Sequence, residues 1–199
     1  MTKLYDRQNS LNLKIPDEVY IIGCGGVGTW LGIICAMVGI KTINLFDSDY
    51  IENHNRARLP YPEEWNGKKK TEALKMFINW IRPECTIYDN DAIMEETDLI
   101  AITSKNVFDC TDNAKTQNMI YNYCKSNNYD YVKLGCNSDH VTAISKLDSV
   151  TFTEEDPYGA PTPMYIVPPM LISLYTLWNI THGNTDINYL KNVSKIFNA

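Results

Sequence analysis

Apolar residues come in short runs separated by longer amphipathic stretches along most of the chain. Residues 19–22 form a run of β-branched and aromatic side chains, and residues 41–46 (KTINLF) form a second, more polar segment of the same kind, which predicts two strands. Residues 26–38 between them are apolar on nearly every face, which predicts a buried helix. A strand, a helix and a strand in this order favour a parallel sheet.

The rest of the chain continues this alternation. Further strands are predicted at 85–88, 106–110 and 131–134, and further helices at 69–81, 113–125 and 169–180. We expect 92–102 to be mostly helical, 141–147 to add an antiparallel strand, 188–197 to form a short helix, and 48–67 and 151–168 to be loops.

Together these elements predict one domain over residues 1–199, with residues 1–16 as an N-terminal arm. Its expected fold class is α/β, Rossmann-like and doubly wound. The sheet should be mostly parallel, with helices on both faces and an antiparallel extension.

Composition narrows the possible partners and surroundings. The 199 residues have a formal net charge of −6 and no basic stripe, which argues against a nucleic-acid binder. The N-terminus lacks the apolar core of a signal peptide, and no apolar run is long enough to suggest a membrane span. No two of the six cysteines have C-x-x-C spacing, so a zinc site is not expected. These features predict a reduced, cytoplasmic protein without a membrane partner.

A glycine-rich segment follows the first predicted strand directly. Gly23, Gly25 and Gly28 match G-x-G-x-x-G, and Gly26 lies within the same turn. Glycines here allow a tight turn and a close approach of backbone to phosphate, and the next helix offers free N–H groups to an anion. Asp47 ends the second predicted strand, about 20 residues further on, where a carboxylate commonly binds a ribose hydroxyl.

This loop and acid alone suggest an NAD-dependent oxidoreductase, or a tight turn without a ligand. The residues after Asp47 argue for a different nucleotide. Residues 47–58 supply acids, amides and guanidinium groups, and Lys68, Lys69 and Lys70 open the next predicted helix. A triphosphate needs more cationic contacts than a pyrophosphate, and arginine and lysine supply them. The segment therefore favours ATP.

Four ordered motifs resemble a known family. They are Tyr5-Asp6-Arg7-Gln8, Asn55-Arg56-Ala57-Arg58, Gly67-Lys68-Lys69-Lys70 and Asp109-Cys110-Thr111-Asp112-Asn113. With Asp47 they resemble the ThiF/MoeB family, the ubiquitin-activating-enzyme-like adenylyltransferases. The resemblance spans residues 5–113 and continues more weakly to about residue 180.

The resemblance implies a role for each matching residue. The glycine loop would hold ATP, Asp47 would bind its ribose, and Asp49 would belong to the same nucleotide site. Contacts to the phosphates would come from Asn55, Arg58 and Lys70.

Two further roles follow from the same resemblance. Asp112 would hold Mg²⁺ near the α-phosphate and the incoming carboxylate, although an Asp at this place could instead cap the following helix. Arg7 would act as an arginine finger on the γ-phosphate bound by the partner subunit of a homodimer. Arg7, Arg58, Lys70 and Asp112 are thus the candidate catalytic residues.

The implied reaction joins a carboxylate to AMP and releases pyrophosphate. The expected substrate is a small β-grasp protein of ubiquitin-like or sulfur-carrier type that ends in glycine. Residues 149–168 contain no cysteine, and Cys136 is expected to be structural, so a thioester step is not predicted.

Two departures from the family pattern leave an alternative function open. Gln117 stands where the family typically has an arginine, and the zinc cysteines of many members are absent. These departures motivate a nucleotide-binding pseudoenzyme or adaptor of the same fold.

Overall fold

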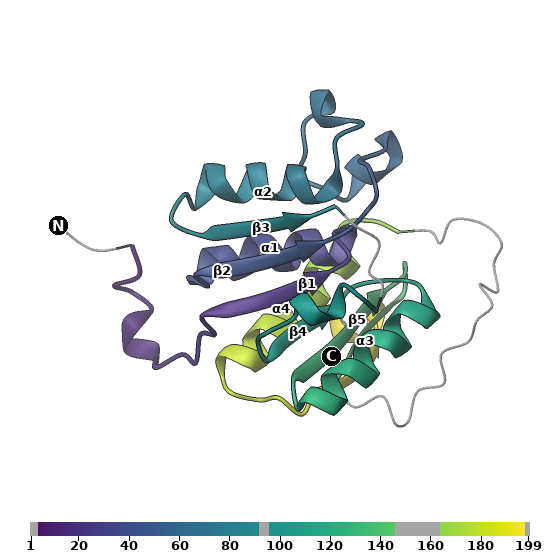
Figure 1. Cartoon of the computed structure of the whole chain (residues 1–199). Coiled ribbons are helices and arrows are strands. Elements are labelled where there is room, and N and C mark those ends of the chain that lie inside the picture. Colours follow the sequence, from purple (N-terminus) through teal and green to yellow (C-terminus); the bar gives the residue numbers. More distant parts are fainter. Residues whose placement is uncertain (1–3, 92–95, 146–163, 198–199) are drawn as a thin grey trace.

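The computed structural model describes residues 4–91, 96–145 and 164–197. Its strands form one seven-stranded sheet in the order β3-β2-β1-β4-β5-β6-β7 (Figure 1). The strands are β1 (Glu18–Ile22), β2 (Thr42–Phe46), β3 (Thr86–Asn90), β4 (Asn106–Asp109), β5 (Asp130–Cys136), β6 (His140–Ile144) and β7 (Asn188–Asn192). The first five run parallel, whereas β6 and β7 pair antiparallel. The predicted mostly parallel sheet with an antiparallel extension is confirmed.

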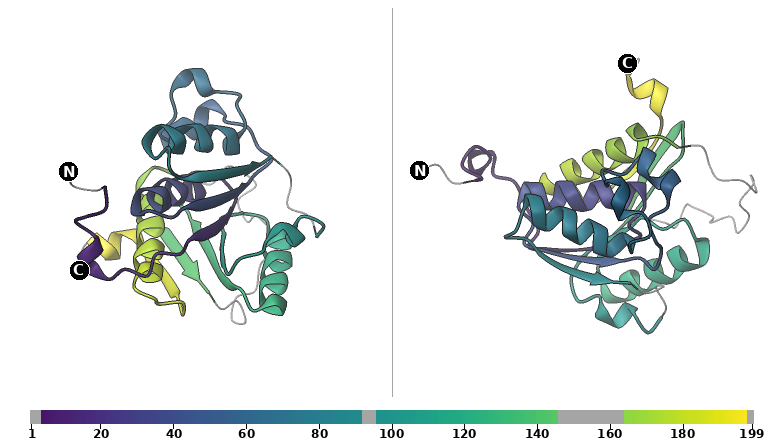
Figure 2. Two further views of the ribbon diagram at one scale, coloured as in Figure 1. Left: turned by 60° about the vertical axis from the view of Figure 1, so that its left-hand side comes forward. Right: turned by 90° about the horizontal axis from the view of Figure 1, so that it is seen from above.

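Helices cover both faces of this sheet, as predicted (Figures 1 and 2). The α-helices are α1 (Gly26–Val38), α2 (Lys70–Ile81), α3 (Ala114–Asn127), α4 (Val167–Thr181) and α5 (Val193–Phe197). Short 3-10 helices are η1 (Asn9–Leu11), η2 (Asn53–Ala57), η3 (Glu63–Trp65) and η4 (Leu99–Ala101). Within the described ranges, none of the helices combines the length and apolar character needed to cross a bilayer.

The alternation of side chains along β1 explains the two layers. Val19 and Ile21 belong to one apolar cluster, to which α1, α2 and α4 contribute, whereas Tyr20 and Ile22 belong to a second cluster with α3 and η4. Successive strand residues point to opposite faces, so a central strand buried on both faces is apolar throughout. Ser173 also ties α4 to α1, because its hydroxyl donates to the Val27 carbonyl at 3.1 Å.

Two predicted helices are confirmed only in part. Residues 188–197 were expected to add a short helix, and α5 is that helix, but β7 occupies the first half of the segment. Pairing with β6 explains the difference, since an edge strand supplies hydrogen bonds that local propensity does not foresee. Of the predicted helix at 92–102, residues 92–95 lie outside the described range, and the remainder contains only η4.

Other boundaries moved by a few residues. The helix predicted from residue 69 begins at Lys70, and Asn113 caps α3 instead of belonging to it. The predicted loop at 48–67 contains η2 and η3, and most of the predicted loop at 151–168 lies outside the described residues.

The N-terminal arm packs against the end of α1 that lies farthest from the glycine loop. The Gln8 side-chain amide donates to the Val38 carbonyl at 2.7 Å, and the Tyr5 ring covers Gly39. Figure 1 shows the arm beside the amino ends of the parallel strands, at the opposite edge from their arrowheads.

Helix α2 offers a direct test of this packing. Ile78 is completely buried, so Ile78→Ala should lower the free energy of unfolding by about 2–4 kcal/mol, through lost burial and a residual cavity. Trp80 lies on the same helix and is 78% exposed, so Trp80→Ala should lower it by less than about 1 kcal/mol. Urea titration measures both values, and equal losses in the two variants would contradict the orientation of α2.

Candidate functional site

A cavity of about 500 Å³ opens at the carboxyl edge of the parallel strands. The chain runs outward from β1 to β2 and β3, then returns to place β4 on the other side of β1. Ligands of open α/β sheets bind at this reversal of strand order. The lining residues are Ile22, Gly23, Gly25–Val27, Phe46–Asp49, Arg58, Lys70, Cys110–Asn113, Thr116, Gln117, Lys133–Cys136 and Met164.

The glycine loop forms the floor of this cavity for steric reasons. Gly23 has a φ of +91°, and a Cβ there would lie 2.8 Å from the Cys110 carbonyl oxygen. A Cβ on Gly28 would lie only 1.8 Å from the Gly23 carbonyl oxygen. At Gly25, by contrast, a Cβ would meet nothing within 4 Å. Two glycines therefore close the turn, whereas Gly25 leaves space for a ligand.

Asp47 ties this loop to the end of β2. One carboxylate oxygen accepts the Cys24 N–H at 2.6 Å, and the other accepts the Asp49 N–H at 2.8 Å. A carboxylate offers about four acceptor sites, so two remain for the hydroxyl groups of a ligand. The Asp47 carboxylate can thus organise the loop and bind a ribose at once.

The structure separates the three consecutive lysines. Lys70 lines the cavity, and its ammonium lies 2.6 Å from the Asp49 carboxylate with only 13% of the side chain exposed. Lys68 pairs with Glu72 one helical turn away, and the Lys69 ammonium lies 4.2 Å from the centre of the Tyr50 ring. Of these lysines, only Lys70 lines the cavity.

Arg58 also lines the cavity, whereas Asn55 does not. The Arg58 side chain crosses the glycine loop, since a Cβ on Gly26 would lie 3.3 Å from its Cδ. Its buried Nε has no hydrogen-bond partner among the described residues. Asn55 instead accepts the Glu52 N–H at 3.1 Å with its side chain and the Arg58 N–H at 3.0 Å with its carbonyl. Asn55 therefore positions Arg58, and its predicted phosphate contact stays a prediction.

Asp112 lies at the rim of the cavity in an exposed position. It does not cap α3, because that role belongs to Asn113, whose side chain accepts the Thr116 N–H at 3.0 Å. The Asp112 carboxylate is therefore not occupied by capping, and its predicted role at Mg²⁺ stays a prediction.

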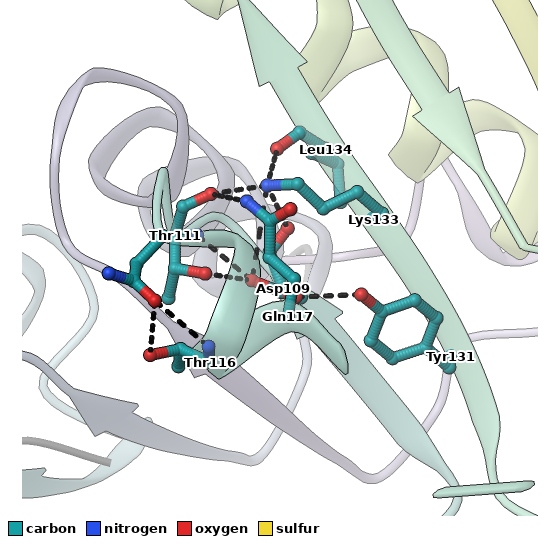
Figure 3. A network of polar contacts seen from close by, with 8 residues as sticks. Asp109, Thr111, Thr116, Gln117, Tyr131, Lys133 and Leu134 are labelled. Atoms are coloured by element: carbon teal, nitrogen blue, oxygen red, sulfur yellow. Dashed lines mark hydrogen bonds and ion pairs between the residues drawn. The ribbon is translucent and has the colours of Figure 1, made fainter. Parts of the chain in front are cut away.

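Asp109, at the end of β4, is the centre of a polar network (Figure 3). Asp109 is completely buried, and its carboxylate accepts the Tyr131 hydroxyl at 2.7 Å and both the N–H and the hydroxyl of Thr111 at 2.9 and 2.7 Å. Lys133 and Gln117 both donate to the Thr111 carbonyl. This network fixes the loop that presents Asp112.

Sequence reasoning missed Lys133 as a site residue. It lines the cavity from β5, with 12% of its side chain exposed. A single lysine inside an otherwise apolar predicted strand is a signal that could have found it. Gln117, identified from the sequence as a departure, also lines the cavity and is buried.

The two cysteines of the cavity wall are poor nucleophiles. Burial raises the pKa of the Cys136 thiol to about 11, although the Arg58 and Lys133 charges oppose this shift. Burial likewise raises the pKa of the Cys110 thiol. Both thiols are thus neutral near pH 7, and the thiolate is the reactive form.

Arg7 does not reach the cavity of its own chain. It is exposed on the arm, next to Gln8, which binds the far end of α1. A helix of 13 residues is roughly 20 Å long, and the glycine loop lies at its other end. The predicted role of Arg7 as an arginine finger stays a prediction.

The lining suits a polyphosphate and a magnesium ion. Arg58 has an unpartnered buried nitrogen, Lys70 supplies a second cation, and Gly25 leaves room for phosphate. No cluster of three metal-binding side chains occurs among the described residues. Mg²⁺ usually takes one or two carboxylates together with phosphate oxygens and water, so Asp112 alone suffices on the protein side.

Comparisons with known proteins identify sequences similar to this chain. The sequence model of the ThiF family matches residues 6–156. The tRNA threonylcarbamoyladenosine dehydratase of Haemophilus influenzae is 34% identical over 138 residues, which cover 67% of this chain and 52% of that protein. Ubiquitin-like modifier-activating enzyme 5 of Drosophila ananassae is 27% identical over 158 residues, which cover 70% and 40%.

Solved structures show the same fold. E. coli MccB with MccA-N7isoASN has a TM-score of 0.77 at 20% identity, covering 93% of this chain and 65% of that chain. E. coli MccB with ATP has a TM-score of 0.72 at 22% identity, covering 86% and 56%. Of the two relatives compared by sequence, the chain spans about half the length of the Haemophilus influenzae protein and less than half of the Drosophila ananassae protein.

The glycine loop generates a stability prediction. Gly28→Ala should lower the free energy of unfolding by about 3 kcal/mol, because the new methyl group would overlap the Gly23 carbonyl. Gly25→Ala should lower it by at most about 1 kcal/mol, since its methyl group enters open space. Thermal and denaturant unfolding compare the two variants, and a Gly28→Ala protein as stable as wild type would refute the close approach.

Proposed function

This chain is a member of the ThiF family, and on that premise we propose that it adenylates a carboxylate with ATP. The observation that carries the proposal is the placement of Arg58, Lys70 and Asp112 around the glycine loop in one cavity. Two cations and a metal-binding carboxylate suit a triphosphate with its magnesium ion, and exceed what a dinucleotide pyrophosphate requires.

The reaction follows from this set of side chains. A carboxylate oxygen of the substrate attacks the α-phosphorus of ATP, the bond from that phosphorus to the bridging oxygen breaks, and pyrophosphate leaves with the bonding electrons. The attacking group is already an anion, so no enzyme base is needed. Catalysis then consists of alignment and of neutralising the phosphate charge.

Each residue has a defined task in this scheme. Asp47 holds the ribose while it fixes the glycine loop, and free N–H groups at the start of α1 face the phosphates. Lys70 exchanges its contact with Asp49 for a contact with a phosphate oxygen. The Arg58 Nε, which has no partner among the described residues, donates to another phosphate oxygen. Mg²⁺ held by Asp112 would withdraw electron density from the α-phosphate.

The substrate that we propose is the C-terminal carboxylate of a small ubiquitin-like or sulfur-carrier protein. The relative from Drosophila ananassae, named as an activating enzyme of a ubiquitin-like modifier, supports this choice. The neutral thiols of Cys110 and Cys136 favour an adenylate product without a thioester on this cavity wall.

We further propose that the active form is a homodimer in which Arg7 of each chain serves the other chain's site. The support is the position of the arm, about one helix length from the cavity of its own chain. The exposed Arg7 guanidinium of one chain would add positive charge at the γ-phosphate bound by the other chain.

Pyrophosphate exchange into ATP, in the presence of a small glycine-ending protein, tests the activity. Wild type should exchange, and Lys70→Ala should reduce exchange about 10- to 100-fold, as expected for one lost charge-assisted contact. Lys68→Ala is the matched control and should stay within about twofold, because Lys68 pairs with Glu72 away from the cavity.

Calorimetry with ATP and NAD gives the accompanying binding measurement. Binding of NAD without binding of ATP would overturn the proposal in favour of an oxidoreductase. Binding of ATP without exchange for any glycine-ending protein would indicate a pseudoenzyme.

Mixing two inactive variants tests the shared site. Arg7→Ala and Asp112→Ala should each abolish exchange, whereas equal mixing should restore about a quarter of wild-type activity. Half of the dimers formed would be mixed, and each would hold one intact site. No recovery, despite subunit exchange shown by light scattering and native mass spectrometry, would remove Arg7 from the site.

A further inference from the structure

Lys133 is a buried cation in the wall of the cavity that none of the assigned roles uses. It lies on β5, and only 12% of its side chain is exposed. Figure 3 shows its ammonium turned toward the loop that follows β4. A charge held away from water needs polar partners or an opposite charge, so its contacts indicate its role.

Its contacts are mostly neutral. The ammonium donates to the carbonyl of Thr111, to that of Leu134 at 2.8 Å and to that of Asp109 at 3.4 Å. The Asp109 carboxylate lies 3.9 Å away, and three shorter hydrogen bonds from Thr111 and Tyr131 already engage it. The Lys133 ammonium is thus held in place without a short ion pair. An anion in the cavity would supply the close negative partner that the ammonium lacks.

The order of the strands places Lys133 at one end of the cavity. Asp47 follows β2, and three strand spacings separate β2 from β5, which is roughly 14 Å. Asp49 and Lys70 lie on the Asp47 side, whereas Lys133 lies beyond β4 and the loop that carries Asp112. An anion that meets Lys133 therefore lies at the end of the cavity away from the nucleotide's ribose.

We infer that Lys133 binds the carboxyl group that is activated, and so positions the acyl half of the adenylate. The inference rests on the proposed function and adds a specificity-determining residue to it. The lysine gives up its long contact with the Asp109 carbonyl and donates to an oxygen of the substrate carboxylate. The Asp109 network keeps the loop in place while this exchange occurs.

Gln117 provides a way to separate charge from structure. Its side-chain amide donates at 2.7 Å to the Thr111 carbonyl, the same oxygen that Lys133 contacts. A guanidinium at position 117 would therefore bring a positive charge to the place where the Lys133 ammonium lies. Gln117→Arg should replace the charge of Lys133 without replacing its contact with Leu134.

Binding of two probes isolates the acyl half. The first is 5′-O-[N-(N-acetylglycyl)sulfamoyl]adenosine, a stable anionic analogue of a glycyl adenylate, and the second is AMP, which is also anionic beside the ribose but lacks the acyl group. Calorimetry would measure Kd for wild type, Lys133→Met, Lys133→Arg and Lys133→Met with Gln117→Arg. Lys105→Met, an exposed lysine away from the cavity lining, is the matched control.

The expected result is selective. Lys133→Met should raise the Kd of the acyl analogue about 10- to 100-fold and leave the Kd of AMP within about twofold of wild type. Lys133→Arg and the double variant should recover most of this loss, and the control should bind both probes like wild type. Unfolding temperatures of each variant establish that the folded protein is being compared.

Other outcomes overturn the inference. Equal weakening of both probes would make Lys133 a purely structural residue, and unchanged binding would remove it from the site. Failure of Gln117→Arg to rescue Lys133→Met would also refute a role of charge. Exchange assays on wild type judge the adenylation proposal separately, because the probes measure binding without turnover.

Discussion

The contact between the backbone at Gly23 and Gly28 sets the geometry of everything around it. A Cβ at Gly28 would lie 1.8 Å from the Gly23 carbonyl, so only glycine lets α1 start this close to the end of β1. The start of α1 consequently faces the carboxyl edge of the sheet, at the point where the strand order reverses. Side chains from η2, α2 and the end of β4, which follow α1 along the chain, all lie around this fixed helix end.

The charged groups around the cavity are held by partners that a ligand can replace. Lys70 rests on an exposed carboxylate, Arg58 lies across the glycine loop with one unpartnered nitrogen, and Lys133 rests on carbonyl oxygens. None of these contacts is a deeply buried short ion pair, which a ligand would have to break at a high free-energy cost. The wall is therefore oriented in advance, and its charges remain available to an anionic ligand.

Sequence patterns recovered the parts of the site that depend on local constraints. The glycine loop, Asp47 and Lys70 follow from spacing and family motifs, and each lines the cavity. The Asn55 side chain shapes η2, and its predicted contact with the phosphates stays a prediction, because a motif alone does not distinguish a ligand-binding residue from a supporting one.

Features that depend on strand pairing were harder to foresee. Strand β7 exists because β6 offers it an edge, and Lys133 enters the site because β5 lies beside β4. The sequence of residues 188–197 or 131–134 alone does not indicate which strand each segment will pair with. Long-range pairing of this kind overrides local propensity, which explains why both were missed.

The strand order also divides the chemistry of the cavity. In the function that we propose, the nucleotide end of the cavity depends on β2 and α2, the acyl end depends on β4 and β5, and both share the β1–α1 turn. A change in the β5 wall would therefore alter which carboxylate is accepted while leaving the contacts of Asp47 and Lys70 untouched. Because the thiols of this wall are neutral, the wall would contribute to that reaction by placing the carboxylate against the α-phosphate, and selectivity and rate would depend on the same side chains.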